Sequence, residues 1–230
     1  MRTISVGHSP DADDIFMYYA IKFGWVGIEN TKFENIALDI ETLNQATLKG
    51  IYDICAISFA LYPFVKDDFA LLKTAVSFGE GYGPKLIKKK GTKLKKNFKV
   101  ALSGEFTTNA LLFKIAYPDA RISYMNFLDI ENAVINGDVD AGVLIHESIL
   151  TYSSVLEVER EIWDIWVELC NGEELPLPLG GMCLRRSIPL HEAIKYENAL
   201  IKAVDVANKN RKTLAPMLLE KGLRSEEHTS

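Results

Sequence analysis

Short apolar runs and longer amphipathic stretches follow one another along most of this chain of 230 residues. The short runs have the length of buried strands, and the longer stretches repeat apolar residues at the period of a helix. Strands are predicted at residues 3–7, 37–40, 54–57, 71–77, 99–103, 122–124 and 141–145, and helices at residues 13–23, 42–49, 59–65, 106–115, 129–136, 161–169, 190–208 and 212–219. This alternation favours an α/β fold.

Two stretches interrupt the alternation. Glycines at 79, 81 and 83 and Pro84 lead into a run of lysines, and residues 175–186 are predicted to be extended because they contain two X-Pro steps. We predict that these are the crossovers of a two-lobed protein, with lobe 1 at residues 1–87 and 186–223 and lobe 2 at residues 88–185. Two lobes with mixed sheets, flanking helices and a ligand cleft between them are the layout of type II periplasmic-binding-protein folds. That layout alone predicts binding, not chemistry.

The lysine run holds six lysines between residues 88 and 96. It allows two interpretations, a phosphate-binding patch or a solvated loop between the lobes. No aromatic residue interleaves with the lysines, which favours the loop. The last residues, 224–230, have no periodicity and are predicted to be a non-native tail.

The composition is that of a globular protein that does not bind nucleic acid. The net charge is −5 and the sequence pI about 5.5, so no overall positive field attracts nucleic acid or anionic lipid. We expect no leader before the first strand, and no apolar run reaches the roughly 20 residues of a membrane span, so we expect a cytoplasmic protein with no membrane partner. Cys55, Cys170 and Cys183 are widely spaced and are predicted to be reduced core thiols.

Candidate chemistry lies in three segments that follow predicted strands, because ligands of open parallel sheets bind beyond the carboxyl ends of the strands. The first is Gly-His-Ser-Pro-Asp-Ala-Asp-Asp at residues 7–14. Asp11 or Asp13 is predicted to cap the following helix. Ser9 and Asp14 are candidates to contact a substrate, although capping alone also explains the carboxylates. His8 is either a substrate contact or incidental.

The second segment is Ser-Gly-Glu-Phe-Thr-Thr-Asn at residues 103–109. Its glycine allows close approach to the backbone, and the hydroxyls of Thr107 and Thr108 join the free N–H groups of a helix start. We favour a site for a carboxylate, because N-capping explains one threonine more readily than two.

In the third segment, residues 140–148, four apolar residues are followed by His146. This order places an imidazole at the exit of a buried strand, where it can act as a general base at neutral pH. The alternative is a core histidine bonded to the backbone. Glu147, as the next residue, more naturally points away from His146 than toward it.

Other catalytic motifs are absent from the sequence. The glycines at 79–83 do not lead from a strand into a helix as a dinucleotide site requires, and there is no Walker motif or nucleophile elbow. The four histidines, His8, His146, His191 and His228, have no metal-ligand spacing, so no metal site is predicted.

Taken together, the segments resemble those of 1,4-dihydroxy-6-naphthoate synthases. The matching stretches lie in the family's order at residues 7–16, 39–44, 81–84, 107–108, 142–148, 151–152, 175–180 and 185–186. Residues 9–14 read Ser-Pro-Asp-Ala-Asp-Asp where the family commonly has Ser-Pro-Cys-Pro-Asn-Asp. Members of the family are also longer, so we expect this chain to stop short of C-terminal helices that complete lobe 1.

The resemblance implies a lyase of the futalosine route to menaquinone that uses no cofactor and forms 1,4-dihydroxy-6-naphthoate from cyclic dehypoxanthinylfutalosine. It makes His146 the proton acceptor, Thr107 and Thr108 a substrate-binding pair, and Ser58 part of another binding segment. Two alternatives are the chorismate dehydratase of the same route and a solute-binding protein without catalysis. Ile-His-Glu at 145–147 and Leu-Pro-Leu-Gly at 177–180 favour the synthase over the first. The missing export signal argues against the second.

Overall fold

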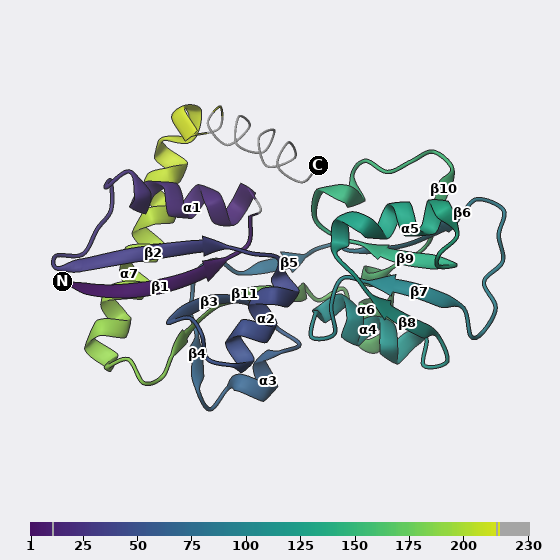
Figure 1. Ribbon diagram of the computed structural model, residues 1–230, viewed down its shortest axis with the longest axis horizontal. Coiled ribbons are helices and arrows are strands. Elements are labelled where there is room, and N and C mark those ends of the chain that lie inside the picture. The colour runs from purple at the N-terminus through teal and green to yellow at the C-terminus, as the bar shows by residue number, and fades with distance from the viewer. Residues whose placement is uncertain (11, 215, 217–230) are drawn as a thin grey trace. The chain divides into compact units, whose positions relative to one another are not determined.

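The computed structural model describes residues 1–10, 12–214 and 216, without the side chains of residues 12–16 and 147. The chain forms two compact units, which we call unit 1 and unit 2. Unit 1 contains Met1–Ile57, Phe64–Val76 and the chain from Gly181 onward, and unit 2 contains Ser58–Pro63 and Ser77–Gly180. Each unit has a mixed sheet flanked by helices (Figure 1), which confirms the predicted α/β class.

The strands and helices alternate in the first half of each unit. The strands are β1 (Arg2–His8), β2 (Thr31–Ala37), β3 (Ile54–Ser58), β4 (Phe69–Leu71), β5 (Ser77–Gly79), β6 (Lys85–Lys89), β7 (Lys99–Leu102), β8 (Arg121–Tyr124), β9 (Ala141–Leu144), β10 (Leu156–Glu161) and β11 (Leu177–Arg185). The helices are α1 (Ala12–Lys22), α2 (Ile40–Leu48), α3 (Tyr62–Val65), α4 (Thr108–Ala116), α5 (Ile130–Asn136), α6 (Ile162–Leu169) and α7 (Leu190–Lys209), with short 3-10 turns at Phe127–Asp129 and His146–Ile149.

The sheet of unit 1 has the order β2-β1-β3-β11-β4, and β5 pairs with the first residues of β11. Strand β1 runs parallel to β2 and β3, whereas β11 runs antiparallel to β4. The apolar residues of β1 and β3 are buried, including Ile4, Val6, Ile54 and Ile57. The carboxyl ends of β1 and β3 therefore lie at the same edge of this sheet.

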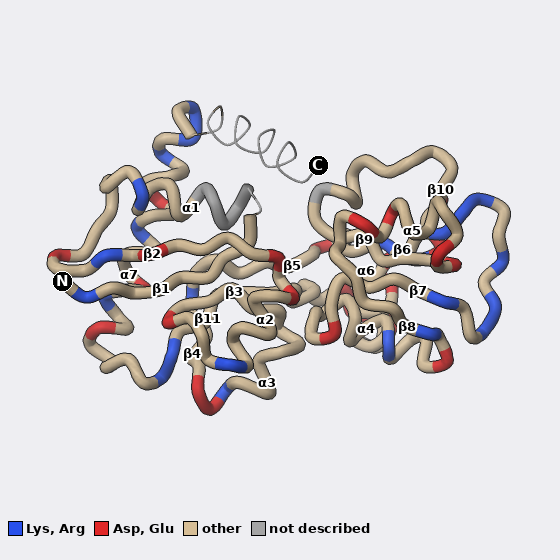
Figure 2. Tube along the Cα trace, viewed as in Figure 1, with Lys and Arg blue, Asp and Glu red and all other residues tan. Residues whose placement is uncertain are grey.

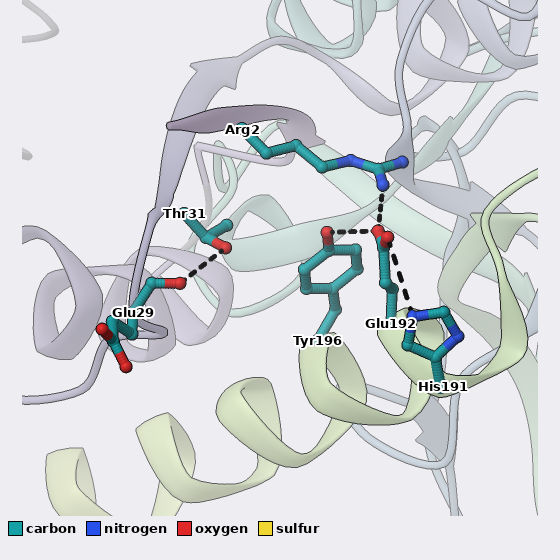
Figure 3. A network of polar contacts seen from close by, with 6 residues as sticks. All are labelled: Arg2, Glu29, Thr31, His191, Glu192 and Tyr196. Atoms are coloured by element: carbon teal, nitrogen blue, oxygen red, sulfur yellow. Dashed lines mark hydrogen bonds and ion pairs between the residues drawn. The ribbon is translucent and has the colours of Figure 1, made fainter.

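Helix α7 packs against α1 and is fixed to the start of the first strand by polar contacts (Figure 3). The guanidinium of Arg2 forms an ion pair with the carboxylate of Glu192, which also accepts a hydrogen bond of 3.0 Å from the hydroxyl of Tyr196. The ring of Tyr196 meets that of Phe33 on β2 edge-on, with 6.0 Å between centroids. Because exposed ion pairs contribute little to stability, the apolar face of α7 holds this helix in place. Its buried residues are Tyr196, Ala199, Leu200, Ala203 and Ala207.

The sheet of unit 2 has the order β10-β6-β9-β7-β8, with β7 parallel to both β8 and β9. Side chains alternate between its two faces, as the pleat requires. Val100 and Leu102 belong to the core on the side of α4 and α6, whereas Ala101 belongs to the core on the side of α5. The helices accordingly cover both faces of the sheet (Figure 1).

The predicted unit boundaries differ from those of the structure. Apart from the short segment Ser58–Pro63, which belongs to unit 2, the chain leaves unit 1 after Val76 and returns at Gly181, not after residues 87 and 185. Leu86 and Ile87 are completely buried in the two cores of unit 2, so β6 is part of that sheet. The lysine-rich loop that follows joins β6 to β7 inside unit 2 and is not a crossover.

Two strand predictions were wrong in position, strands β6 and β10 were missed, and β11 was predicted only as an extended crossover. The strand predicted at 37–40 lies at Thr31–Ala37, and Asp39 instead caps α2. The strand predicted at 71–77 is two short strands, because Ala75 has a φ of 54°, which no strand residue adopts. The two missed strands are paired, and the alternating glutamates of β10 form ion pairs with lysines of β6, such as Glu159 with Lys88 at 2.5 Å.

The remaining predictions concern the C-terminal end of the chain, the cysteines and membrane spans. Of the helix predicted at 212–219, residues 212–214 and 216 are described and are helical, whereas the other four residues and the tail at 224–230 lie outside the described residues. The three cysteines are free thiols, as predicted, but only Cys55 and Cys183 are core residues, whereas Cys170 is half-buried. Among the described helices, none is long and apolar enough to cross a membrane.

Candidate active site

Two of the three predicted segments meet at one edge of the unit 2 sheet. Residues 103–109 follow β7 and residues 145–148 follow β9. These strands are parallel neighbours, with Val100 opposite Ala141 and Ala101 opposite Gly142. Their carboxyl ends therefore lie side by side, and so do the segments that carry the threonines and His146.

His146 occupies an unusual backbone conformation at this edge. Its φ is 52°, in the left-handed region that residues other than Gly, Asn, Asp and His rarely adopt. The imidazole is half-buried and lies edge-on to Phe127, with 5.2 Å between ring centroids. Phe127 comes from the 3-10 turn after β8, so residues that follow β8 and β9 meet here. Strained backbone of this kind is concentrated at functional sites.

The neighbours of His146 in sequence are fixed by backbone contacts. The hydroxyl of Ser148 donates a hydrogen bond of 2.5 Å to the carbonyl of Ile145. The side chain of Glu147, which was predicted to point away from the imidazole, lies outside the described residues.

Thr107 is the N-cap of α4. Its hydroxyl accepts a hydrogen bond of 3.4 Å from the N–H of Ala110 and donates one of 2.9 Å to the carbonyl of Gly104. The residue has an extended backbone, with ψ near 148°, and only 2% of its surface is exposed. Local capping thus accounts for this threonine.

Thr108 makes contacts that no local motif predicts. Its hydroxyl donates a hydrogen bond of 2.7 Å to the carbonyl of Leu179 and accepts one of 3.3 Å from the N–H of Ala60. The carbonyl of Leu179 also accepts a hydrogen bond from the N–H of Phe59. The segment that begins at Ser58 is therefore joined to the start of α4 through Thr108. Both threonine hydroxyls already have partners, unlike the free pair that the anion-site prediction assumed.

Ser103 and Asn109 also belong to this edge, although the sequence analysis did not single them out. The side-chain amide of Asn109 lies 3.4 Å from the hydroxyl of Ser103, and both residues are over nine-tenths buried. The amide oxygen of Asn109 has no hydrogen-bond partner within the described part of the chain. A buried acceptor without a partner costs free energy. In the sequence, only the neighbouring Thr107 and Thr108 drew attention to this segment.

The remaining candidates lie at the ends of β1 and β3. Ser9 and Ser58 are buried, with 7% and 4% of their surfaces exposed. The ring of His8 stacks on Tyr18 with 4.3 Å between centroids, and its Nδ1 lies 2.7 Å from the carbonyl oxygen of Ser9. Burial lowers the pKa of His8, so the ring is neutral at pH 7. The backbone of Asp11 and the side chains of Asp13 and Asp14, predicted as caps or substrate contacts, lie outside the described residues.

The candidates are thus divided between the units. Ser9 and His8 belong to unit 1, whereas Ser58, Thr107, Thr108 and His146 belong to unit 2. Within the described residues, no group of three or more His, Cys, Asp or Glu side chains is arranged to hold a metal ion.

Comparison with known proteins gives consistent matches over nearly the whole chain. A family model described as menaquinone biosynthesis matches residues 4–230. Two curated proteins named 1,4-dihydroxy-6-naphthoate synthase are each 30% identical to the chain. The one from Thermus thermophilus aligns over 90% of this chain and 72% of its own length, and the one from Streptomyces coelicolor over 95% and 78%.

Solved structures show the same fold. The crystal structure of protein AF1704 from Archaeoglobus fulgidus is 35% identical, with a TM-score of 0.87 over 94% of this chain and 81% of that one. The periplasmic aliphatic sulphonate binding protein SsuA from Escherichia coli has a TM-score of 0.67 at 12% identity, covering 96% of this chain and 78% of SsuA. The latter likeness places the chain in the periplasmic-binding-protein fold, as predicted, and shows nothing further.

Proposed function

This chain belongs to the menaquinone biosynthesis family, and we propose that it is a 1,4-dihydroxy-6-naphthoate synthase. The reaction is the formation of 1,4-dihydroxy-6-naphthoate from cyclic dehypoxanthinylfutalosine by a carbon–carbon lyase. The observation that carries the proposal is the 30% identity to two proteins of that name across at least 90% of the chain. We place the reaction in the cytoplasm and assign it no cofactor.

His146 is the base in this proposal. A neutral imidazole removes a proton from a hydroxyl of the sugar-derived ring, and the O–H electron pair forms a carbonyl as the adjacent carbon–carbon bond breaks. The electrons of that bond pass into the ring that becomes aromatic. The position of His146 after β9 and its positive φ support the role, because ligands bind beyond the carboxyl ends of strands and strained backbone is concentrated at functional sites.

The start of α4 binds the substrate's carboxylate in this proposal. The N–H groups of the first turn have no partner within the helix and attract an anion. Each threonine hydroxyl has one proton, which Thr107 gives to Gly104 and Thr108 to Leu179. To bind the substrate, either hydroxyl must therefore exchange its hydrogen bond to the carbonyl for one to the carboxylate. A carboxylate is the stronger acceptor. Ser58, Ser9 and Asp14 complete the proposed set of substrate contacts.

The activity is tested by incubating the protein separately with cyclic dehypoxanthinylfutalosine and with chorismate, followed by mass spectrometry of the products. We expect 1,4-dihydroxy-6-naphthoate from the first and no change in the second. Turnover of chorismate would replace the proposal with the dehydratase. Binding without turnover of either compound would replace it with a non-catalytic binding protein.

The base is tested with His146→Asn, because asparagine tolerates a left-handed backbone and cannot accept the proton. We expect kcat to fall by about 10²–10⁴-fold with KM little changed, which is the usual contribution of a positioned base. His191→Asn is the matched control, since the side chain of His191 is exposed on α7. A folded His146→Asn variant with unchanged kcat would remove His146 from the mechanism.

A further inference from the structure

A cavity lies in unit 2, at the edge of the sheet opposite His146. Its volume is about 280 Å³, and its wall includes Lys89, Lys93, Lys95, Arg121, Asn97 and Asp140. Asn97 and Asp140 lie just before β7 and β9, and Arg121 is the first residue of β8. The cavity is therefore at the amino ends of the three parallel strands, whereas the candidate active site is at their carboxyl ends.

The cavity is bordered by the most basic stretch of an acidic protein. Residues 85–99 contain eight lysines and no aspartate or glutamate, although the whole chain has a net charge of −5. Figure 2 shows this basic colour along the loop between β6 and β7. Such a local excess of one charge is unfavourable unless something compensates it.

Only some of these lysines are compensated within the protein. Lys88 pairs with Glu157 and Glu159, and Lys96 pairs with Asp119. The ammonium group of Lys89 lies beside Gly137 at the end of α5, where the helix carbonyls attract a cation. Lys93 and Lys95 are exposed and have no ion-pair partner in the described part of the chain.

The polar groups of the cavity wall are ordered by backbone contacts. The guanidinium of Arg121 donates from Nε to the carbonyl of Asn97 at 3.1 Å, which fixes its orientation. The carboxylate of Asp140 accepts a hydrogen bond of 2.7 Å from the N–H of Lys99. Four cationic side chains thus surround a cavity whose wall, among the described residues, has one carboxylate.

We propose that this cavity is a binding site for a phosphate-bearing anion. Lysine ammonium groups and an arginine fork are the usual protein partners of phosphate oxygens. A cavity of about 280 Å³ has room for a phosphate-bearing group, since a water molecule in the liquid takes only about 30 Å³. The occupant does not compete with the substrate, because the two sites lie at opposite edges of the sheet.

The site is tested on the whole chain by calorimetric titration with inorganic diphosphate in 0.1 M salt. The test variant replaces Lys93 and Lys95 by glutamine, and the matched control replaces Lys66 and Lys202, two exposed lysines of unit 1. The control removes the same net charge. A third variant, with Lys93→Arg and Lys95→Arg, keeps the charge at the site.

We expect saturable binding to the unchanged chain, the control and the arginine variant, and at least about tenfold weaker binding to the glutamine variant, as for loss of a charged hydrogen bond. No saturable binding, or equal weakening in the control, would overturn the site. Vesicles containing phosphatidylglycerol identify the source of the phosphate. Vesicle binding that diphosphate displaces makes a lipid headgroup the occupant, whereas saturable diphosphate binding without displaceable vesicle binding makes a free phosphate compound the occupant.

Discussion

Adjacent threonines at positions 107 and 108 have the same chemistry but different partners. Thr107 bonds to Gly104 and Ala110, which are three residues away on either side. Thr108 bonds to Ala60 and Leu179, which are 48 and 71 residues away. A local rule therefore predicts the first threonine's role, whereas the second threonine's role depends on the folded chain.

Thr108→Val removes the hydroxyl and keeps the shape of the side chain. We expect the free energy of unfolding to fall by about 1–3 kcal/mol, because the N–H of Ala60 and the carbonyl of Leu179 lose a buried partner. Thr108→Ser keeps the hydroxyl and should recover most of this loss. Urea denaturation measures both variants, and equal midpoints for Val and Thr at this position would contradict the structural role.

The same pair of variants separates stability from substrate binding. If Thr108 also donates to the substrate's carboxylate, KM for the valine variant rises at temperatures where the variant remains folded. An unchanged KM in the folded valine variant would leave Thr108 with its structural role alone.

His8 gives a prediction about pH. Burial lowers its pKa in the folded protein, so the unfolded chain takes up a proton at a higher pH than the folded one. The contribution of His8 to the free energy of unfolding is therefore fully present above the unfolded pKa of about 6.5. It is lost as the pH falls from there toward the folded pKa. The slope for one proton is at most about 1.4 kcal/mol per pH unit.

His8→Gln tests this contribution, because glutamine does not titrate. We expect the variant to lose less stability than the unchanged chain between pH 7 and pH 5, measured by urea denaturation at each pH. His191→Gln, at an exposed position, is the control for the substitution itself. Parallel pH profiles for His8→Gln and the unchanged chain would refute the assignment.

At the level of the elements, helix α5 packs closely on β9 because residue 142 is glycine. A Cβ at this position would lie 2.4 Å from Cγ2 of Ile130 and 3.1 Å from Cγ2 of Val134, both on α5. These two side chains are almost completely buried in the core on that face of the sheet. The glycine therefore sets the distance between helix and strand, immediately before the strand end that carries His146.

Gly142→Ala should force α5 away from the sheet and lower the free energy of unfolding by about 1–3 kcal/mol, as other overpacked cores do. Gly27→Ala is the control, since no atom lies within 4 Å of a Cβ at that position and its backbone is not left-handed. Thermal and urea denaturation measure both. A Gly142→Ala variant as stable as Gly27→Ala would mean that the helix moves without cost.

Helices were predicted better than strands for a physical reason. Helix α5 ends at Gly137, whose φ of 83° is the usual left-handed end of a helix, and the sequence signal is local. Strands β2 and β10 are edge strands with charged residues on one or both faces, so their apolar pattern is weak. Their pairing with distant strands determines that they are extended, and no local window contains that information.

On the scale of the whole molecule, the reactivity of the cysteine thiols shows whether the core opens. Cys55 on β3 and Cys183 on β11 are completely buried in unit 1, and burial raises the pKa of the Cys183 thiol. Cys170, at the end of α6 in unit 2, is half-buried. A thiol reagent should reach only Cys170, the half-buried cysteine, while the fold is intact.

We expect a disulfide reagent at pH 8 to label one thiol per chain within minutes and all three only in denaturant. Cys170→Ser should abolish the fast reaction. Rapid labelling of two or three thiols in the native protein would mean that unit 1 opens readily around β3 and β11.

The sequence by itself determined the fold class, most helices and the short list of residues at strand ends, because hydrophobic period, helix caps and the order of motifs are local properties of the chain. Tertiary structure alone decided which strands pair, where one unit ends and the next begins, and which partners Thr108 has. It also showed that His146 is held with a positive φ and that the lysine-rich loop borders a cavity. These features depend on contacts between residues far apart in the chain, which only the folded backbone brings together.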